Sequence, residues 1–240
     1  FPIISEGQII EAEGEYKKGK YGEQFVCSII KYHSPKTAEA ITRYLASGLI
    51  KGIGPVTASA IVDKFGENTL EIIEKAPSAL TEIKGISGKK AAEIGAAVLA
   101  LKDMQAAVMY LQKYNITINL ALKIYKKYHS GTQEILSENP YRLIEDVEGI
   151  GFITADKIAS NMGIEKDSEF RIRAGLIYAL KNTAEAVGST YMPKGELISI
   201  LSELLDLDFT QKKLADVFEN VLVNLMIDGV VKKIEDGNEN

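Results

Sequence analysis

The 240-residue sequence has little of several residue types on which familiar kinds of site depend. It contains one cysteine, two histidines and no tryptophan. A single thiol, Cys27, excludes a disulfide scaffold, favours a reducing compartment and is expected to pack in the core. With only His33 and His129 beside it, we expect no metal site. No signal peptide and no run of 18 apolar residues is visible, so no membrane-spanning helix is expected.

An excess of charge of one sign is also missing from most of the chain. Each successive block of fifty residues up to residue 200 carries six Lys or Arg and six Asp or Glu. The last forty residues carry four against nine, which accounts for the whole net charge of −5. Without a broad basic face, any binding to DNA must use local geometry rather than bulk attraction.

The pattern along the chain predicts a mainly α fold with a small β segment. Residues 1–35 are expected to hold two strands within 7–32, joined by a polar turn at 17–20, as a hairpin or a partial OB-like barrel. Residues 167–240 are expected to hold helices over 170–187, 194–205 and 211–228, followed by a strand over 229–234. Three helices that end in a strand suggest a winged-helix-like module.

Between these parts, one short pattern recurs at glycine turns between helices. It is GIGPVTA in hairpin 1 (52–58), GISGKKA in hairpin 2 (85–91) and GIGFITA in hairpin 3 (149–155). An offset of 63 residues aligns a degenerate hairpin 4, NITINLA (115–121), with hairpin 1. Residues 37–162 are therefore predicted to be a duplication, with one pair of hairpins in 36–103 and another in 104–166.

The turns suit contact with phosphate. In G-I-G the isoleucine packs inward, while the flanking glycines allow positive φ and close approach of a ligand to the backbone. The next helix begins with unsatisfied N–H groups and a partial positive charge, which attract anions regardless of base sequence. Thr57, Lys90 and Thr154 occupy the same register in the first helical turn.

The three glycine patterns are similar to the helix-hairpin-helix motif, a sequence-independent DNA-binding element. Two longer segments carry a further resemblance. They are residues 47–91, which include hairpins 1 and 2, and residues 137–159, which read SENPYRLIEDVEGIGFITADKIA. Both resemble the N-terminal region of RecD-like DNA helicases, the family of the exodeoxyribonuclease V α subunit. The resemblance implies helicase motor domains downstream, with ATP and Mg²⁺ as their cofactors. The chain begins with Phe1-Pro2, and we expect it to be a fragment of such a protein.

No phosphate loop of the form G-x-x-x-x-G-K-[ST] occurs, and the segment 85–90 has the wrong spacing. We therefore expect no catalytic site in this part and no cofactor bound to it.

Local charge ranks the hairpins as binding sites. Hairpin 2, flanked by lysines with Glu82 as its one near acid, ranks first and hairpin 1 second. Hairpin 3 follows three carboxylates (Glu145, Asp146 and Glu148) that oppose phosphate, so it is expected to be mainly structural, and hairpin 4 to be pure scaffold. The candidate DNA-binding residues are Lys51, Gly52, Gly54, Thr57, Lys84, Gly85, Ser87, Gly88, Lys89, Lys90, Gly149, Gly151 and Thr154.

Two other groups of residues leave alternatives open. Lys123, Lys126 and Lys127 form a basic strip with Tyr125 and Tyr128 that suits a phosphate backbone or merely confers solubility. Arg171 and Arg173 open a predicted helix, where a positive charge is unfavourable unless an external partner such as DNA or the motor domains compensates it.

The sequence thus predicts a non-catalytic region that binds and docks DNA without reading its bases. It would belong to a larger RecD-like helicase of DNA recombination or repair, in the cytoplasm at the nucleoid. Its partners would be the DNA backbone, including single-/double-strand junctions, and the motor domains. The alternative is a protein-interaction scaffold, and a weaker one is an autonomous nuclease or glycosylase, for which no catalytic pocket is marked.

Overall fold

The computed structural model describes residues 4–20, 22–188 and 191–234. The chain divides into two compact units, unit 1 (residues 1–133) and unit 2 (residues 134–240). The predicted boundary at 103/104 falls inside one continuous helix of unit 1, α4 (Gly88–Gln112). The four-part division otherwise stays a prediction.

The N-terminal sheet consists of β1 (Ile9–Gly19) and β2 (Gly22–His33), which pair in antiparallel register from Ile9 opposite His33 to Gly19 opposite Gly22. The predicted hairpin is confirmed, but the predicted turn at 17–20 is too early. Lys17 and Lys18 still pair within the ladder, opposite Gln24 and Glu23.

Among the described residues, the hairpin packs against the helices at the end where Ile30 lies. Ile30 is buried and its N–H donates to Oε1 of Gln112 at 3.3 Å, while Nε2 of Gln112 donates to the Ser28 carbonyl at 3.2 Å. Most other side chains of the two strands are exposed. Cys27 is partly exposed rather than in the core, because it lies beyond this contact.

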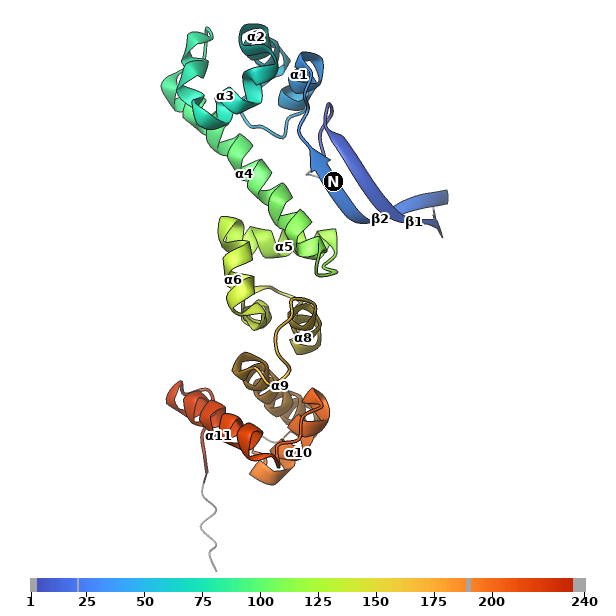
Figure 1. Ribbon diagram of the computed structural model, residues 1–240, viewed down its shortest axis with the longest axis vertical. Coiled ribbons are helices and arrows are strands. Elements are labelled where there is room, and N and C mark those ends of the chain that lie inside the picture. The colour runs from blue at the N-terminus through green and yellow to red at the C-terminus, as the bar shows by residue number, and fades with distance from the viewer. Residues whose placement is uncertain (1–3, 21, 189–190, 235–240) are drawn as a thin grey trace, which may run out of the picture. The chain divides into compact units, whose positions relative to one another are not determined.

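Unit 1 continues with short helices arranged about α4. They are α1 (Ala38–Ala46), α2 (Pro55–Phe65), η1 (Gly66–Asn68), α3 (Thr69–Lys75), η2 (Pro77–Glu82), α5 (Ile118–Tyr128) and η3 (His129–Gly131), and α6 (Thr132–Glu138) crosses into unit 2. Figure 1 shows α3 beside one end of α4 and α5 beside the other, in agreement with the contacts between these helices.

By length and composition alone, α4 is apolar enough to cross a membrane, with a mean hydropathy of 1.4 over 18 residues. Its packing assigns it instead to the core of unit 1, where it contacts α3, η2, α5 and β2. Its buried side chains include Ile94, Val98 and Leu111.

The predicted duplication is visible in the backbone at the 63-residue offset. Gly66, at φ 57° and ψ −139°, corresponds to His129 at φ 50° and ψ −132°. The buried Thr69 donates its hydroxyl hydrogen to the Gly66 carbonyl at 2.6 Å, and the buried Thr132 donates to the His129 carbonyl at 2.7 Å. The same short turn therefore follows α2 and α5.

Unit 2 contains η4 (Pro140–Arg142), α7 (Leu143–Asp146), α8 (Phe152–Asn161), α9 (Glu169–Val187), α10 (Lys194–Leu205) and α11 (Lys212–Ile227). The three C-terminal helices agree with the prediction. Gly175 allows α9 to approach α10, since a Cβ there would lie 2.9 Å from Cδ2 of Leu205.

The strand predicted over 229–234 is wrong. The turn at Gly229 is followed by irregular backbone, with Val230 and Ile234 exposed. A β-branched run makes a strand only where a neighbour accepts its ladder of hydrogen bonds, and unit 2 has no other strand among its described residues. The described residues thus form the helices of the predicted winged-helix-like module without its wing.

Candidate nucleic-acid interface

All four hairpins share one backbone geometry. The first residue of each turn has positive φ: 95° at Gly52, 90° at Gly85, 86° at Gly149 and 58° at Asn115. The isoleucine that follows is buried in every case, with 3–6% of its surface exposed, as is the alanine five residues further on, which has no exposed surface in any hairpin. The predicted inward packing of the isoleucine is confirmed.

Hairpin 4 keeps the shared turn without the glycines of the pattern. Asn115 stands at the position of the first glycine and holds positive φ, at 58°. Asparagine tolerates the left-handed region better than other residues with a Cβ, because its short side chain bonds to the local backbone. Hairpin 4 is therefore a fully formed member of the set.

The second glycine of the G-I-G turn does not have the positive φ that was expected of both glycines. Gly54 and Gly151 have φ of −101° and −93°, so positive φ is required only at the first glycine. Each is the N-cap of the following helix, a position that takes extended backbone. Ser87 and Thr117 occupy this position in hairpins 2 and 4, and their hydroxyls accept hydrogen bonds from the N–H groups of Lys90 and Leu120.

This difference decides which helix N-termini stay open. Gly54 and Gly151 make no side-chain cap, and a Cβ at either would meet no atom within 4 Å. The first turns of α2 and α8 therefore have N–H groups that no N-cap side chain occupies, which we call open N-termini. In α2 these are the N–H groups of Val56 and Thr57, because Pro55 has none. Thr57 is half-buried and Thr154 exposed in the first turns of these helices.

Hairpins 1 and 2 lie side by side in unit 1. A Cβ added to Gly52 would lie 3.9 Å from Cε of Lys90, so the Lys90 side chain extends over the turn of hairpin 1. Lys51, Lys84 and Lys89 are exposed and Lys90 is half-buried. We call these four residues the lysine cluster; Gly85 and Gly88, also predicted site residues, are exposed between them.

No carboxylate neutralises the lysine cluster in the part of the chain that the structure describes. None of its four members takes part in an ion pair there. Glu82, the one acid noted near hairpin 2, is held by Lys64, whose Nζ lies 2.7 Å from Oε2 of Glu82. Sequence spacing alone could not show this pairing, because Lys64 is eighteen residues away.

Hairpin 3 has a different environment. Glu145 and Glu148 are exposed beside it, and Oδ2 of Asp146 lies 3.7 Å from Nε of Arg142. Phe152, which replaces the exposed Pro55 of hairpin 1, is 1% exposed. Its ring is stacked with those of Tyr141 and Tyr178, with centroids 6.2 and 5.3 Å away. Hairpin 3 is thus anchored in the core of unit 2.

A polar network joins the same region. Arg171 makes a bidentate ion pair with Asp156, in which Nε donates to Oδ1 at 2.8 Å and Nη2 donates to Oδ2 at 3.1 Å. Nη1 of Arg171 donates to the carbonyls of Lys166 and Leu205. The Tyr141 hydroxyl donates to Asp156 at 2.6 Å. Of the two alternatives left open for these arginines, the structure gives internal compensation: Arg171 pairs with Asp156, and Arg173 pairs with Asp228 at 2.9 Å.

The network shifts the proton affinities of its members. Burial raises the pKa of Asp156, but the hydrogen bonds from Arg171 and Tyr141 and the attraction to Arg171 outweigh it, so the pKa of Asp156 is lowered. Burial and the hydrogen bond to Asp156 raise the pKa of Tyr141. Asp156 is therefore a charged structural group that holds α8 to α9.

The two units carry opposite charge, which the count in blocks of fifty residues conceals. Unit 1 has 17 Lys or Arg and 13 Asp or Glu, a net charge of +4. Unit 2 has 11 against 20, a net charge of −9. The predicted site residues of hairpins 1 and 2 lie in the positive unit, and those of hairpin 3 lie in the negative one.

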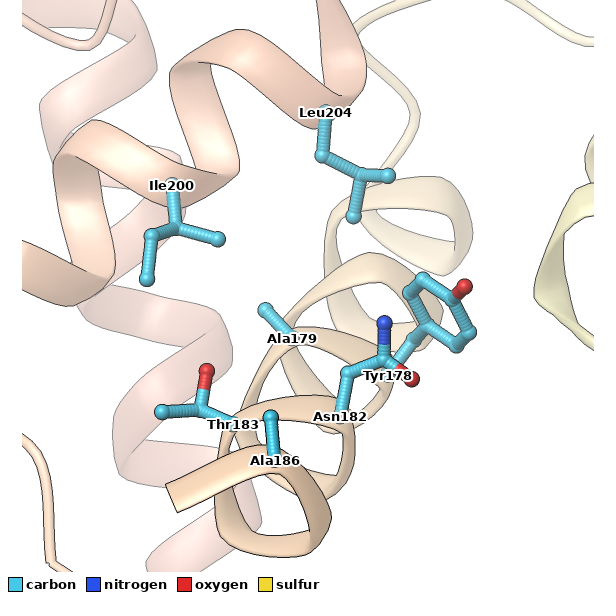
Figure 2. A pocket seen from close by; sticks show the side chains of 7 residues that line it. All are labelled: Tyr178, Ala179, Asn182, Thr183, Ala186, Ile200 and Leu204. Atoms are coloured by element: carbon cyan, nitrogen blue, oxygen red, sulfur yellow. The ribbon is translucent and has the colours of Figure 1, made fainter.

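No group of three or more His, Cys, Asp or Glu side chains that could hold a metal ion occurs among the described residues. A shallow depression of about 280 Å³ lies between α9 and α10 in unit 2. Figure 2 shows its lining, in which Asn182 and Thr183 are the polar residues beside Tyr178, Ile200 and Leu204. It contains no acid or base suited to catalysis.

The class of protein follows from the hairpins and from comparison with known families. Residues 43–98 match the family of SAM-like tandem helix-hairpin-helix domains, and residues 100–191 match the helix-hairpin-helix domain of ATP-dependent RecD2 DNA helicases. The chain is 26% identical over 197 residues to the ATP-dependent RecD2 DNA helicase of Deinococcus radiodurans. This alignment covers 80% of the chain and 27% of the relative, so the chain spans about a quarter of that protein's length.

These matches support a similarity to the N-terminal helix-hairpin-helix region of RecD-like DNA helicases, and they support the description of the chain as a DNA-binding region. The resemblance stated from the motifs is thereby confirmed.

Proposed function

We propose that this region binds the DNA backbone through hairpins 1 and 2 without reading base sequence, and positions DNA for the motor domains of a RecD-like helicase. The observation that carries the proposal is the lysine cluster around two adjacent hairpins, with no carboxylate partner among the described residues. Ammonium groups and open helix N–H groups both recognise phosphate oxygens, which are the same for every base sequence.

The two hairpins contribute in different ways. The open N-terminus of α2 at Gly54 supplies N–H groups, whereas the N-terminus of α4 is capped by Ser87 and supplies Lys89 and Lys90. Lys90 extends over Gly52 and so brings its charge to the turn of hairpin 1. One phosphate group bound there would contact both hairpins.

The proposal extends to the setting of the whole protein. Unwinding, with ATP and Mg²⁺ as cofactors, is assigned to motor domains outside this chain. The preferred DNA is a duplex or a single-/double-strand junction, and the process is DNA recombination or repair in the cytoplasm.

The experiment is a salt titration of binding, followed by fluorescence anisotropy with a labelled junction. Lys89→Ala combined with Lys90→Ala is expected to weaken binding equally for unrelated DNA sequences and to lower the salt slope by about 2. A matched control removes two exposed helix lysines of unit 2, Lys157→Ala with Lys181→Ala, and should leave the slope unchanged. Wild-type protein that stays unbound at low salt would refute the proposal.

A protein-interaction scaffold is the second candidate, and the charge of unit 2 favours it. With a net charge of −9, unit 2 repels DNA but would attract a basic protein surface. The depression between α9 and α10 offers apolar contact for such a partner (Figure 2). Binding to purified motor domains that is abolished by high salt, together with absence of DNA binding, would favour this function.

A further inference from the structure

A second group of lysines in unit 1 lies outside the proposed binding site. It consists of Lys113, at the C-terminal end of α4, and Lys123 and Lys126 on α5, all exposed. We call it the α5 cluster. Its members have no carboxylate partner among the described residues, and Asp103 is the one acid in the sequence between residues 101 and 133.

The α5 cluster belongs to a formed hairpin. Asn115 holds the turn of hairpin 4 with positive φ, and Thr117 caps α5, with Ile116 buried beneath. Residues 119, 123 and 126 recur at helical spacing, so the exposed Asn119, Lys123 and Lys126 share one face of α5. This face begins at the turn, as the lysine cluster does at hairpins 1 and 2.

The two clusters occupy opposite ends of one rigid element. Lys89 lies in the first turn of α4 and Lys113 at its other end. At about 1.5 Å per residue, these positions are about 36 Å apart along the helix axis. One helical turn of B-form DNA spans about 34–36 Å, so equivalent backbone positions recur at the same interval.

We infer that unit 1 holds duplex DNA at two places about one helical turn apart, with the α5 cluster as a second phosphate-binding site. The inference rests on the proposed function of the lysine cluster and adds to it a second site and a minimum length of duplex. Unit 1 favours such a ligand with a net charge of +4, and the section from residue 101 to 133 carries five lysines against one aspartate.

The test compares duplexes of 20 and 8 base pairs with the full chain. The shorter duplex is about 27 Å long, too short to reach both clusters. On 20 base pairs, Lys123→Ala with Lys126→Ala should lower the salt slope by about 2 and weaken binding at least about tenfold at low salt. On 8 base pairs, the slope should change by less than about 1, because one cluster is engaged at a time.

Folding and charge are controlled separately. Both lysines lie on an exposed helix face, where alanine is the best helix former, and thermal melting checks that the variant folds. Lys157→Ala with Lys181→Ala removes the same charge from unit 2 and should leave the slope on 20 base pairs unchanged.

Each alternative result has a separate meaning. If Lys89→Ala with Lys90→Ala weakens binding while the α5 variant does not, the second site is refuted and the proposed function stands. If neither variant weakens binding, both are refuted. Equal losses on the two duplexes, or on a 20-nucleotide single strand, would overturn the spacing of one helical turn.

Discussion

Hairpin 1 in unit 1 and hairpin 3 in unit 2 have nearly the same sequence and the same backbone, but their surroundings differ in charge and packing. Both have positive φ at the first glycine and an open N-cap glycine. Around hairpin 1 lie lysines and the exposed Pro55, whereas around hairpin 3 lie carboxylates and the buried Phe152. The motif therefore determines the turn, and the residues outside it determine what the turn can bind.

The division of charge between the units supports the same distinction. A phosphate beside Glu145 and Glu148 would be repelled, while one beside Lys89 and Lys90 would be attracted. Variants at equivalent positions of hairpins 1 and 3 test whether the two hairpins differ in packing and charge as described.

The largest effect is expected at the position that differs most between the two hairpins. Phe152→Ala should destabilise the protein by about 3–5 kcal/mol, since it leaves a cavity beside the rings of Tyr141 and Tyr178 that Phe152 contacts. Pro55→Ala, at the same register in hairpin 1, should cost less than about 1 kcal/mol because Pro55 is exposed. Urea denaturation of both variants measures the difference, and equal losses would contradict the structural role of hairpin 3.

A smaller effect is expected from the polar network of unit 2. Asp156→Asn should cost about 2 kcal/mol at pH 7, because Arg171 loses its charged partner. The lowered pKa of Asp156 means that its stabilisation is complete above about pH 4–5 and is lost as the pH falls through that lowered value. The gap in Tm between wild type and variant should therefore narrow below about pH 4. A gap independent of pH down to pH 2 would show that the charge of Asp156 is unimportant.

The smallest effect concerns the two glycines of each turn, and here the variants of hairpin 1 and of hairpin 3 should lose the same stability. Gly52→Ala should cost about 1 kcal/mol, because alanine is strained at φ 95°, and Gly149→Ala should cost the same. Gly54→Ala and Gly151→Ala should each cost less, about 0.5 kcal/mol, since their φ values suit any residue and only the lower preference for alanine at an N-cap remains. Thermal unfolding of the four variants measures this, and a costly Gly54→Ala would contradict the backbone assigned to the turn.

The sequence predicted the parts of the fold that depend on local pattern. The β-hairpin, the three C-terminal helices and the 63-residue duplication follow from residue periodicity and turn composition. The strand over 229–234 could not be excluded in this way, because its formation depends on a neighbouring strand rather than on Val230 and Val231 themselves. Likewise, the positive φ of Asn115 could not be predicted from the sequence, since most asparagines in proteins have negative φ.

The sequence predicted the site residues whose charges lie next to a turn in the chain. It did not predict contacts between residues that only the folded structure brings together. The lysines beside hairpins 1 and 2 are adjacent in sequence to their turns. Three other contacts join residues brought together by the fold: Lys64 with Glu82, Arg171 with Asp156, and Lys90 over Gly52. The difference in charge between the units also became visible only when the structure placed their division at residue 133.

The central claim is that DNA contacts hairpin 1 and not hairpin 3, and a photo-crosslinking measurement tests it most directly. Val56 and Ile153 occupy the same register in the two hairpins and are 85% and 61% exposed. Val56→Cys and Ile153→Cys, each in a Cys27→Ser background, would carry the same thiol-linked photo-crosslinker and be irradiated with a 20-base-pair duplex. The account predicts a crosslink to DNA from position 56 and little or none from position 153. An equal or greater yield from position 153 would contradict it.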